Sequence, residues 1–134
     1  MQLSNRTALN VSVLAYSRVS SSDVIVTAAT TYTTMAGMSL VSTATGTYRI
    51  AFNGFMKNNL HGTSYVGLFI NTTRKIQTIV VDNPDAGEAG GNAPLYDIVS
   101  MVSGDTLKVQ WYVSAGTSTQ YGTSSDRILT YIKL

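Results

Sequence analysis

The sequence predicts an all-β fold of two antiparallel sheets, and three observations carry that prediction. Charged residues make up only 12% of the 134-residue chain. Threonine, serine, valine and tyrosine are abundant instead, and β-branched and aromatic side chains suit pleated, half-buried surfaces. Short alternating runs of polar and apolar residues recur between Gly, Asn, Pro or Ser, while helical periodicity is hard to find. At this length one core is feasible and two are not, so we expect a single domain over residues 1–134.

The alternating runs predict nine strands, at residues 9–17, 23–28, 37–42, 46–56, 64–71, 74–82, 95–102, 105–114 and 127–134. This is about the strand count of an antiparallel two-sheet jelly-roll sandwich. The segment between 82 and 94, DNPDAGEAGGNAP, is rich in Gly and Asn and holds both prolines, which indicates a surface loop. No internal repeat or heptad pattern is present.

Two strands have the clearest alternation. In SGDTLKVQWYV, a turn at Ser103-Gly104-Asp105 precedes a strand whose apolar face is formed by Leu107, Val109, Trp111 and Val113. In TYRIAFNGF, the apolar face is formed by Tyr48, Ile50 and Phe52. Successive residues of a strand point to opposite sides, so we expect both apolar faces to line the core and the backs to be solvated.

Two other strands are apolar on both faces. In YVGLFI, Tyr65 and Phe69 oppose the aliphatic residues, and in RILTYIKL, Leu129 and Tyr131 oppose Ile128 and Ile132. An antiparallel sandwich strand normally covers one core, so the second face needs either another subunit or a loop of its own chain. For the C-terminal strand we favour a subunit interface, with Phe69, Leu129 and Tyr131 as its candidate residues.

Composition excludes several classes of partner. Nine basic and seven acidic residues give a net charge of +2, and the basic residues are scattered except for Arg74-Lys75, so we expect no nucleic acid partner. There is no cysteine, which is compatible with folding in a reducing cytosol. The N-terminus resembles no signal peptide, and nowhere do about 18 apolar residues follow one another. We therefore expect neither conventional secretion nor a membrane partner.

The sequence also lacks a recognisable catalytic constellation. His61 is the only histidine, and it lies among turn-forming residues in KNNLHGTS, so a catalytic triad or a histidine metal site would depend on it alone. No G-x-S-x-G elbow or Walker loop is present, and no two carboxylates stand out as a catalytic pair. We expect no enzymatic activity and no cofactor.

Two weaker binding candidates lie in loops. Asp82, Asp85 and Glu88 fall three residues apart and could offer oxygen ligands to Ca²⁺; their order does not match an EF-hand, and we favour a solvated acidic loop. Tyr121, in GTSTQYGTSSD, could stack on a sugar ring, as could Tyr32, because an aromatic face packs against the apolar side of a pyranose.

Three segments of the chain carry a resemblance to a known family. TGTYRIAFNGFMKN, IVSMVSGDTLKVQWYVSAG and SSDRILTYIKL resemble the G-x-Y-x-[IVF]-x-F strand, the L-x-x-GD-x-[LV]-x-[LV] strand and the terminal strand of C1q/TNF-like jelly rolls. The resemblance covers roughly residues 30 to 134. The C-terminal Phe-Gly pair of the animal C1q branch is replaced here by Leu129-Thr130-Tyr131, which argues against the animal secreted branch.

The resemblance implies a compact homotrimer with its terminal strands packed around a threefold axis. Without a collagen-like tract, the chain looks most like the trimeric knobs of bacteriophage virions. We expect a non-enzymatic capsid decoration protein that is made in the host cytoplasm, binds the major capsid protein and sits on the virion surface. Residues 1–20 would be its first strand or an attachment arm. The alternative is a fibre-tip module that recognises a cell-surface glycan.

Overall fold

The computed structural model describes residues 15–58, 62–81, 91–121 and 127–134, and these contain strands and no helix. The strands are β1 (Tyr16–Ser21), β2 (Ile25–Thr27), β3 (Thr33–Val41), β4 (Gly46–Asn53), β5 (Phe55–Asn58), β6 (Thr63–Ile70), β7 (Thr73–Val81), β8 (Gly91–Asn92), β9 (Leu95–Met101), β10 (Thr106–Val113), β11 (Ser118–Tyr121) and β12 (Arg127–Lys133).

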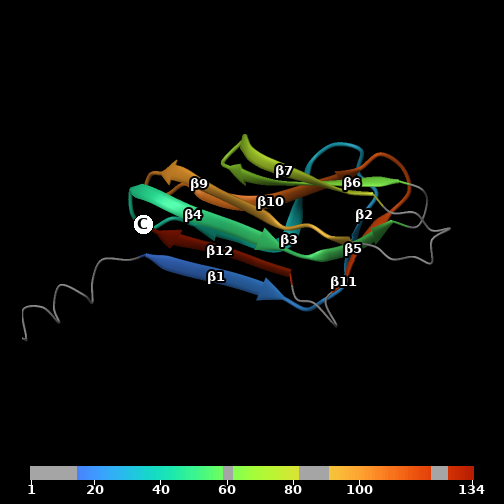
Figure 1. The fold of residues 1–134 in the computed structure, drawn as a ribbon, viewed down its shortest axis with the longest axis horizontal. Coiled ribbons are helices and arrows are strands. Elements are labelled where there is room, and N and C mark those ends of the chain that lie inside the picture. The colour runs from blue at the N-terminus through green and yellow to red at the C-terminus, as the bar shows by residue number, and fades with distance from the viewer. Residues whose placement is uncertain (1–14, 59–61, 82–90, 122–126) are drawn as a thin grey trace, which may run out of the picture.

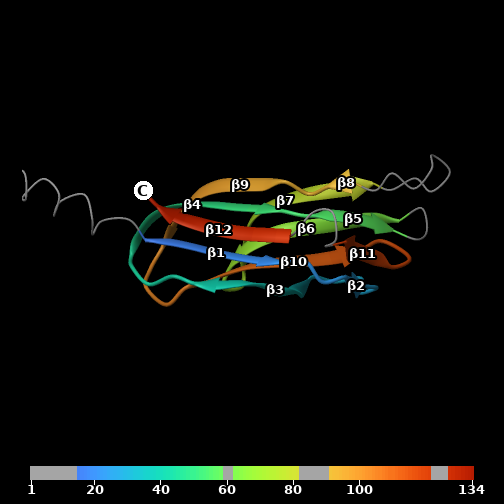
Figure 2. The same ribbon diagram turned by 90° about the horizontal axis from the view of Figure 1, so that it is seen from below.

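Two four-stranded antiparallel sheets form a jelly-roll sandwich, which confirms the predicted fold class (Figure 1). The first sheet has the strand order β1-β12-β4-β9 and the second has the order β3-β10-β6-β7. At the edges of the sandwich β1 contacts β3 and β9 contacts β7, as Figure 2 shows. A third, smaller sheet with the order β2-β11-β5-β8 lies at one end.

The core lies between the two large sheets and is built by the alternation seen in the sequence. β10 buries every second residue, and Leu107, Val109, Trp111 and Val113 are all inside, as predicted. In β4 the residues Tyr48, Ile50 and Phe52 are buried while Arg49 and Asn53 are exposed, also as predicted. Burial of such side chains is the main driving force for folding, at about 25 cal/mol per Å² of apolar surface.

Several strand predictions differ from the structure. The predicted strand 46–56 is two strands, β4 and β5, which separate at the buried Gly54 and join different sheets. The short strands β8 and β11 were not predicted, because GN and STQY have no alternating apolar residues. The predicted strand 9–17 overlaps only the start of β1, and residues 1–14 lie outside the described residues.

The turn before β10 joins three connections at one end of the sandwich. Gly104 has a φ of 95°, a conformation that glycine adopts without strain. The Asp105 carboxylate accepts hydrogen bonds from the Val102 amide at 2.9 Å and from Asn71 Nδ2 at 3.0 Å. The Gly104 amide donates to the Ser42 carbonyl at 2.9 Å. The predicted turn therefore holds the β3–β4 and β6–β7 connections as well as β10.

Candidate functional site

The C-terminal strand β12 has its two faces exchanged relative to the prediction. Leu129 is 0% exposed and Tyr131 is 2% exposed, and both belong to the core of the single chain. They pair with Phe52 and Ile50 of β4, and paired residues of neighbouring strands share a face. Leu129 and Tyr131 are therefore inside their own subunit, and they are not available to a second copy in this fold.

Tyr131 is anchored by polar and aromatic contacts as well as by burial. Its hydroxyl donates to the carbonyl of Val41 at 3.0 Å, which connects the first sheet to β3 of the second. Its ring meets Tyr48 edge to face, with centroids 5.1 Å apart. Edge-to-face aromatic pairs contribute about 1 kcal/mol beyond their buried area, so this residue helps to join the two sheets.

Phe69, the third predicted interface residue, is covered by its own chain. It lies on the outer face of the second sheet, where it pairs with Lys108 and Arg74, yet it is only 7% exposed. The ring of Tyr32, from the β2–β3 connection, meets it edge to face at 4.9 Å. Of the two coverings considered for an apolar second face, a segment of the same chain is the one found at Phe69.

The outer face of the first sheet carries several large apolar side chains among polar ones, and no such covering lies over them among the described residues. Because residues in register share a face, the pairings of β1, β12, β4 and β9 define its rows. One row runs across all four strands through Tyr16, Ile132, Arg49 and Ile98, and the next runs through Arg18, Thr130, Ala51 and Tyr96. We call the apolar members of these rows, together with Ile128 and Leu134, the apolar face.

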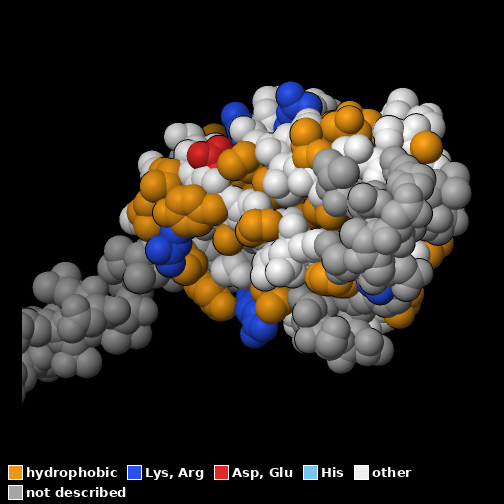
Figure 3. All heavy atoms as spheres, turned by 45° about the vertical axis from the view of Figure 1, so that its right-hand side comes forward, with side chains coloured by type: hydrophobic (Ala, Val, Ile, Leu, Met, Phe, Trp, Pro, Cys, Tyr) orange, Lys and Arg blue, Asp and Glu red, His pale blue; other side chains and the backbone are white. Residues whose placement is uncertain are grey.

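Several members of the apolar face are largely exposed. The exposed fractions are 59% for Tyr16, 56% for Tyr96, 53% for Ile98 and 57% for Leu134, although all four are large apolar side chains. Figure 3 shows hydrophobic side chains gathered on the surface at the end of the molecule where β1 begins, with Lys and Arg beside them. Large contiguous apolar patches on a protein surface mark interaction sites, so this face is the candidate functional site.

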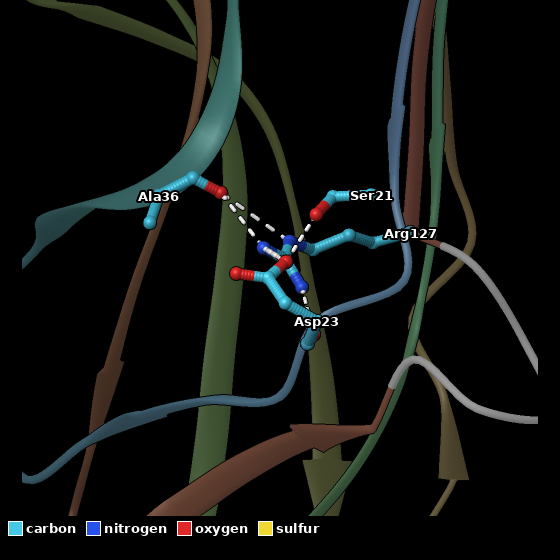
Figure 4. Close-up of polar contacts among 4 residues, drawn as sticks. All are labelled: Ser21, Asp23, Ala36 and Arg127. Carbon is cyan, nitrogen blue, oxygen red and sulfur yellow. Dashed lines mark hydrogen bonds and ion pairs between the residues drawn. The ribbon is translucent and has the colours of Figure 1, made fainter.

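Arg127 fixes the start of β12 and thereby the position of the apolar face (Figure 4). Its side chain is 1% exposed. Its Nη1 donates to the backbone carbonyl of Asp23 at 2.6 Å, and its Nη2 pairs with the Asp23 carboxylate at 2.6 Å. Nε and Nη2 both donate to the carbonyl of Ala36 in β3, at 3.3 and 3.2 Å. One guanidinium thus joins β12 to the β1–β2 connection and to the second sheet.

The Asp23 end of this pair lies at the surface. The hydroxyl of Ser21 donates to the Asp23 carboxylate, which also faces Arg127. Hydrogen bonding from Ser21, followed by the contact with Arg127, lowers the pKa of Asp23 below its ordinary value. The carboxylate therefore remains charged at neutral pH and holds the guanidinium from the solvent side.

The outer face of the second sheet is aromatic and basic. Tyr65 and Tyr112 are cross-strand partners with stacked rings, 4.4 Å apart and 4° from parallel. Tyr32 meets Tyr112 edge to face at 4.6 Å, and its hydroxyl donates to Oε1 of Gln77 at 2.6 Å. Burial raises the pKa of Tyr32, so its hydroxyl stays protonated and remains a donor at neutral pH.

Most of the predicted ligand residues lie outside the part of the chain that the structure describes. Asp82, Asp85, Glu88 and His61 lie outside the described residues, and within the described ranges no group of three metal-ligating side chains is present. Tyr121 is the last residue of β11, paired with Phe55, rather than part of a loop. Its proposed stacking on a sugar stays a prediction. None of the described segments forms a helix long and apolar enough to cross a membrane.

A comparison with one solved structure supports the fold. No protein-family model matches the sequence, and no curated protein sequence matches it. The structure of Eiger TNF from S. frugiperda is similar over 89% of this chain and 92% of its own, with 11% sequence identity and a TM-score of 0.63. Pika GITRL is 18% identical over 77% of each chain, with a TM-score of 0.47. The chain has a TNF-like jelly-roll fold.

Proposed function

We propose that this chain is a non-enzymatic structural protein that assembles as a homotrimer through the apolar face of its first sheet. The observation that carries the proposal is the row of Tyr16, Ile132 and Ile98 across the sheet, with Tyr16 and Ile98 more than half exposed. Exposed apolar side chains gain free energy when a partner removes them from water, at about 25 cal/mol per Å².

The extent of the face fits a subunit contact. Four strands about 4.8 Å apart and roughly seven residues long, at about 3.3 Å per residue, give a flat area of roughly 400 Å². The apolar side chains occupy part of this area, because Arg18, Arg49 and Thr130 lie among them, and exposed apolar patches of a few hundred Å² are often functional. Because side chains project from the sheet and residues at the rim also make contacts, the buried area exceeds the flat area and approaches the roughly 800 Å² per partner of a stable complex.

Charge and symmetry favour a ring over a twofold dimer. Arg49 lies in the middle of the apolar row, and Arg18 lies in the next one. A twofold axis through the middle of this face would bring the two copies of Arg49 together, whereas in a ring this face meets a different surface of the next subunit. The resemblance of the sequence to trimeric jelly rolls supports a ring of three.

The mass of the purified chain tests the assembly directly. Sedimentation equilibrium is expected to give three times 14.3 kDa over a range of concentrations. A mass of one chain at all concentrations would remove the proposal. A mass of two chains would keep the apolar contact but replace the ring with a dimer.

For the biological setting, we propose that the trimer decorates a virion surface by binding the major capsid protein, after synthesis in the host cytoplasm. The support is the resemblance of the sequence to bacteriophage knobs. The test is binding to undecorated capsids by the full chain and by a chain lacking residues 1–14, a deletion that ends before β1 begins at Tyr16. Loss of binding with an intact trimer is expected. Full binding after the deletion would exclude an attachment arm, and no binding by either chain would exclude decoration.

A further inference from the structure

The outer face of the second sheet has a composition that packing alone does not require. Its first row is Lys108, Phe69 and Arg74, its second is Gln110, Gly67 and Gln77, and its third is Tyr112, Tyr65 and Ile79. Basic, amide and apolar groups therefore follow one another along the sheet. None of the four strands contains an aspartate or a glutamate, so the charged side chains that these strands carry are all basic.

Tyr32 holds this face in one arrangement. A Cβ at Gly67 would lie 3.0 Å from Cε1 of Phe69, so glycine is what lets the Phe69 ring, against which Tyr32 packs, lie this close to the sheet. Oε1 of Gln77 accepts from the Tyr32 hydroxyl and from Nη1 of Arg74, each at 2.6 Å. Arg74 is thereby oriented beside the aromatic cluster before any ligand arrives, and preorganised groups bind at lower entropic cost.

Several polar side chains around the tyrosines make no hydrogen bond within the described part of the chain. Within the described part of the chain, the hydroxyls of Tyr65 and Tyr112 and the side chains of Lys108 and Gln110 make no hydrogen bond. Neutral amides and hydroxyls both donate and accept, which suits the hydroxyl groups of a sugar. Lys108 and Arg74 donate only, which suits an anionic oxygen.

One ring face is placed for stacking. Tyr112 covers one side of the Tyr65 ring. The cross-strand partner of Tyr65 on β7 is Ile79, which is half exposed. Tyr112 itself lies between Tyr65 and Tyr32. The face therefore offers one stacking position with a hydrophobic neighbour, rather than the series of free rings that single-stranded nucleic acids use.

We propose that this tyrosine face binds an acidic oligosaccharide, with one sugar ring stacked on Tyr65 beside Ile79 and the carboxylate or sulfate of another sugar, about 13 Å along the strands, held by Lys108 and Arg74. The site is separate from the apolar face, which is on the other sheet. It is also separate from the Tyr121 and 82–94 loop candidates of the sequence analysis. The net charge of +2 is low for a polyanion-binding protein, which favours a short acidic glycan over nucleic acid.

The experiment is a titration of the full chain, followed by NMR or calorimetry, with four probes. They are 3′-sialyllactose, a sulfated heparin tetrasaccharide, neutral lactose and a ten-residue oligothymidine. Binding of one or both acidic sugars at least tenfold tighter than lactose is expected, and the preferred one distinguishes a carboxylate from a sulfate source. Equal binding of lactose, or tighter binding of the oligonucleotide, would overturn the proposal, as would no binding of either acidic sugar.

Variants then locate the site. Tyr65→Leu removes the stacking ring and should weaken binding of the acidic sugar at least tenfold. Lys108→Gln should weaken binding of the acidic sugar while leaving binding of lactose unchanged. Lys133→Gln removes the same charge from the first sheet and should have no effect. Each variant is checked by thermal melting, and binding that persists unchanged in a folded Tyr65→Leu protein would contradict the assignment.

Discussion

The two large sheets share one core, but their outer faces are covered to different extents. On the second sheet, Tyr32 from the β2–β3 connection packs against Phe69 and is tied to Gln77. On the first sheet, Tyr16, Tyr96 and Ile98 remain more than half exposed. Phe69 on the outer face of the second sheet is therefore covered by its own chain, whereas the large apolar residues on the outer face of the first sheet are available to a partner.

Arg127 is the connection on which both faces depend, and its loss should have the largest effect. Arg127→Met keeps much of the side-chain volume but leaves the carbonyls of Asp23 and Ala36 without their donor. We expect a loss of about 3 kcal/mol in the free energy of unfolding. Urea denaturation followed by Trp111 fluorescence measures it. Lys75→Met, at an exposed position of β7, is the control, and equal losses in both variants would refute the role of Arg127.

The covering of the second sheet can be broken at Gly67. Gly67→Ala places a methyl group 3.0 Å from Phe69 Cε1 and 3.2 Å from the Ile76 carbonyl, so we expect a loss of about 1–2 kcal/mol in the free energy of unfolding. In a Phe69→Leu background the nearest atom is absent, and the cost of the alanine should fall. A double-mutant cycle that shows simple additivity would mean that crowding against Phe69 is not the cause.

Acid should weaken the turn end of the sandwich by a smaller amount. Hydrogen bonds from Asn71, and then from the Val102 amide, lower the pKa of Asp105 below its ordinary value. A carboxylate with a lowered folded-state pKa stabilises the fold above the unfolded-state pKa of about 4, and this contribution is lost as the pH falls through the folded-state pKa.

The variant Asp105→Asn should therefore be less stable at pH 7 and lose less stability between pH 5 and pH 2.5 than the unaltered chain. Urea midpoints at several pH values measure this. Asp97→Asn is the control, because the Asp97 carboxylate accepts from the neighbouring Ile98 amide alone among the described residues. A pH dependence that is identical in the Asp105→Asn variant and the unaltered chain would show that the turn carboxylate does not contribute.

Alternation in the sequence was sufficient to predict the core strands, but it did not predict which face of β12 points into the core. In β10 the two faces differ in polarity, so the buried side follows from composition. In β12 both faces are apolar, and only pairing with Phe52 and Ile50 decides that Leu129 and Tyr131 point inward. Register is a tertiary property, and a shift of one residue exchanges the two faces of a strand.

The covering of Phe69 was also beyond sequence reasoning. Tyr32 and Gln77 are 45 residues apart, and no local pattern indicates that a residue from the β2–β3 connection packs on the second sheet. The spacing of Tyr96 and Ile98 was the available signal for the apolar face, since residues two apart share one side of a strand. The fold class was therefore predictable from local pattern, whereas the identity of the free surface required the register of four strands.

The claim that subunits meet at the apolar face is tested most directly by the molecular masses of two matched aspartate variants. Ile98 on the apolar face is 53% exposed, and Val26 on the third sheet is 63% exposed, so an aspartate at either position should leave the single chain folded. The Val26→Asp protein is expected to retain a mass of three times 14.3 kDa. The Ile98→Asp protein should dissociate to a single chain, because the new carboxylate would lie opposite Arg49 and the interface would have to remove this ion pair from water in place of an apolar side chain. Equal trimeric masses for both variants would show that the apolar face is not the contact between subunits.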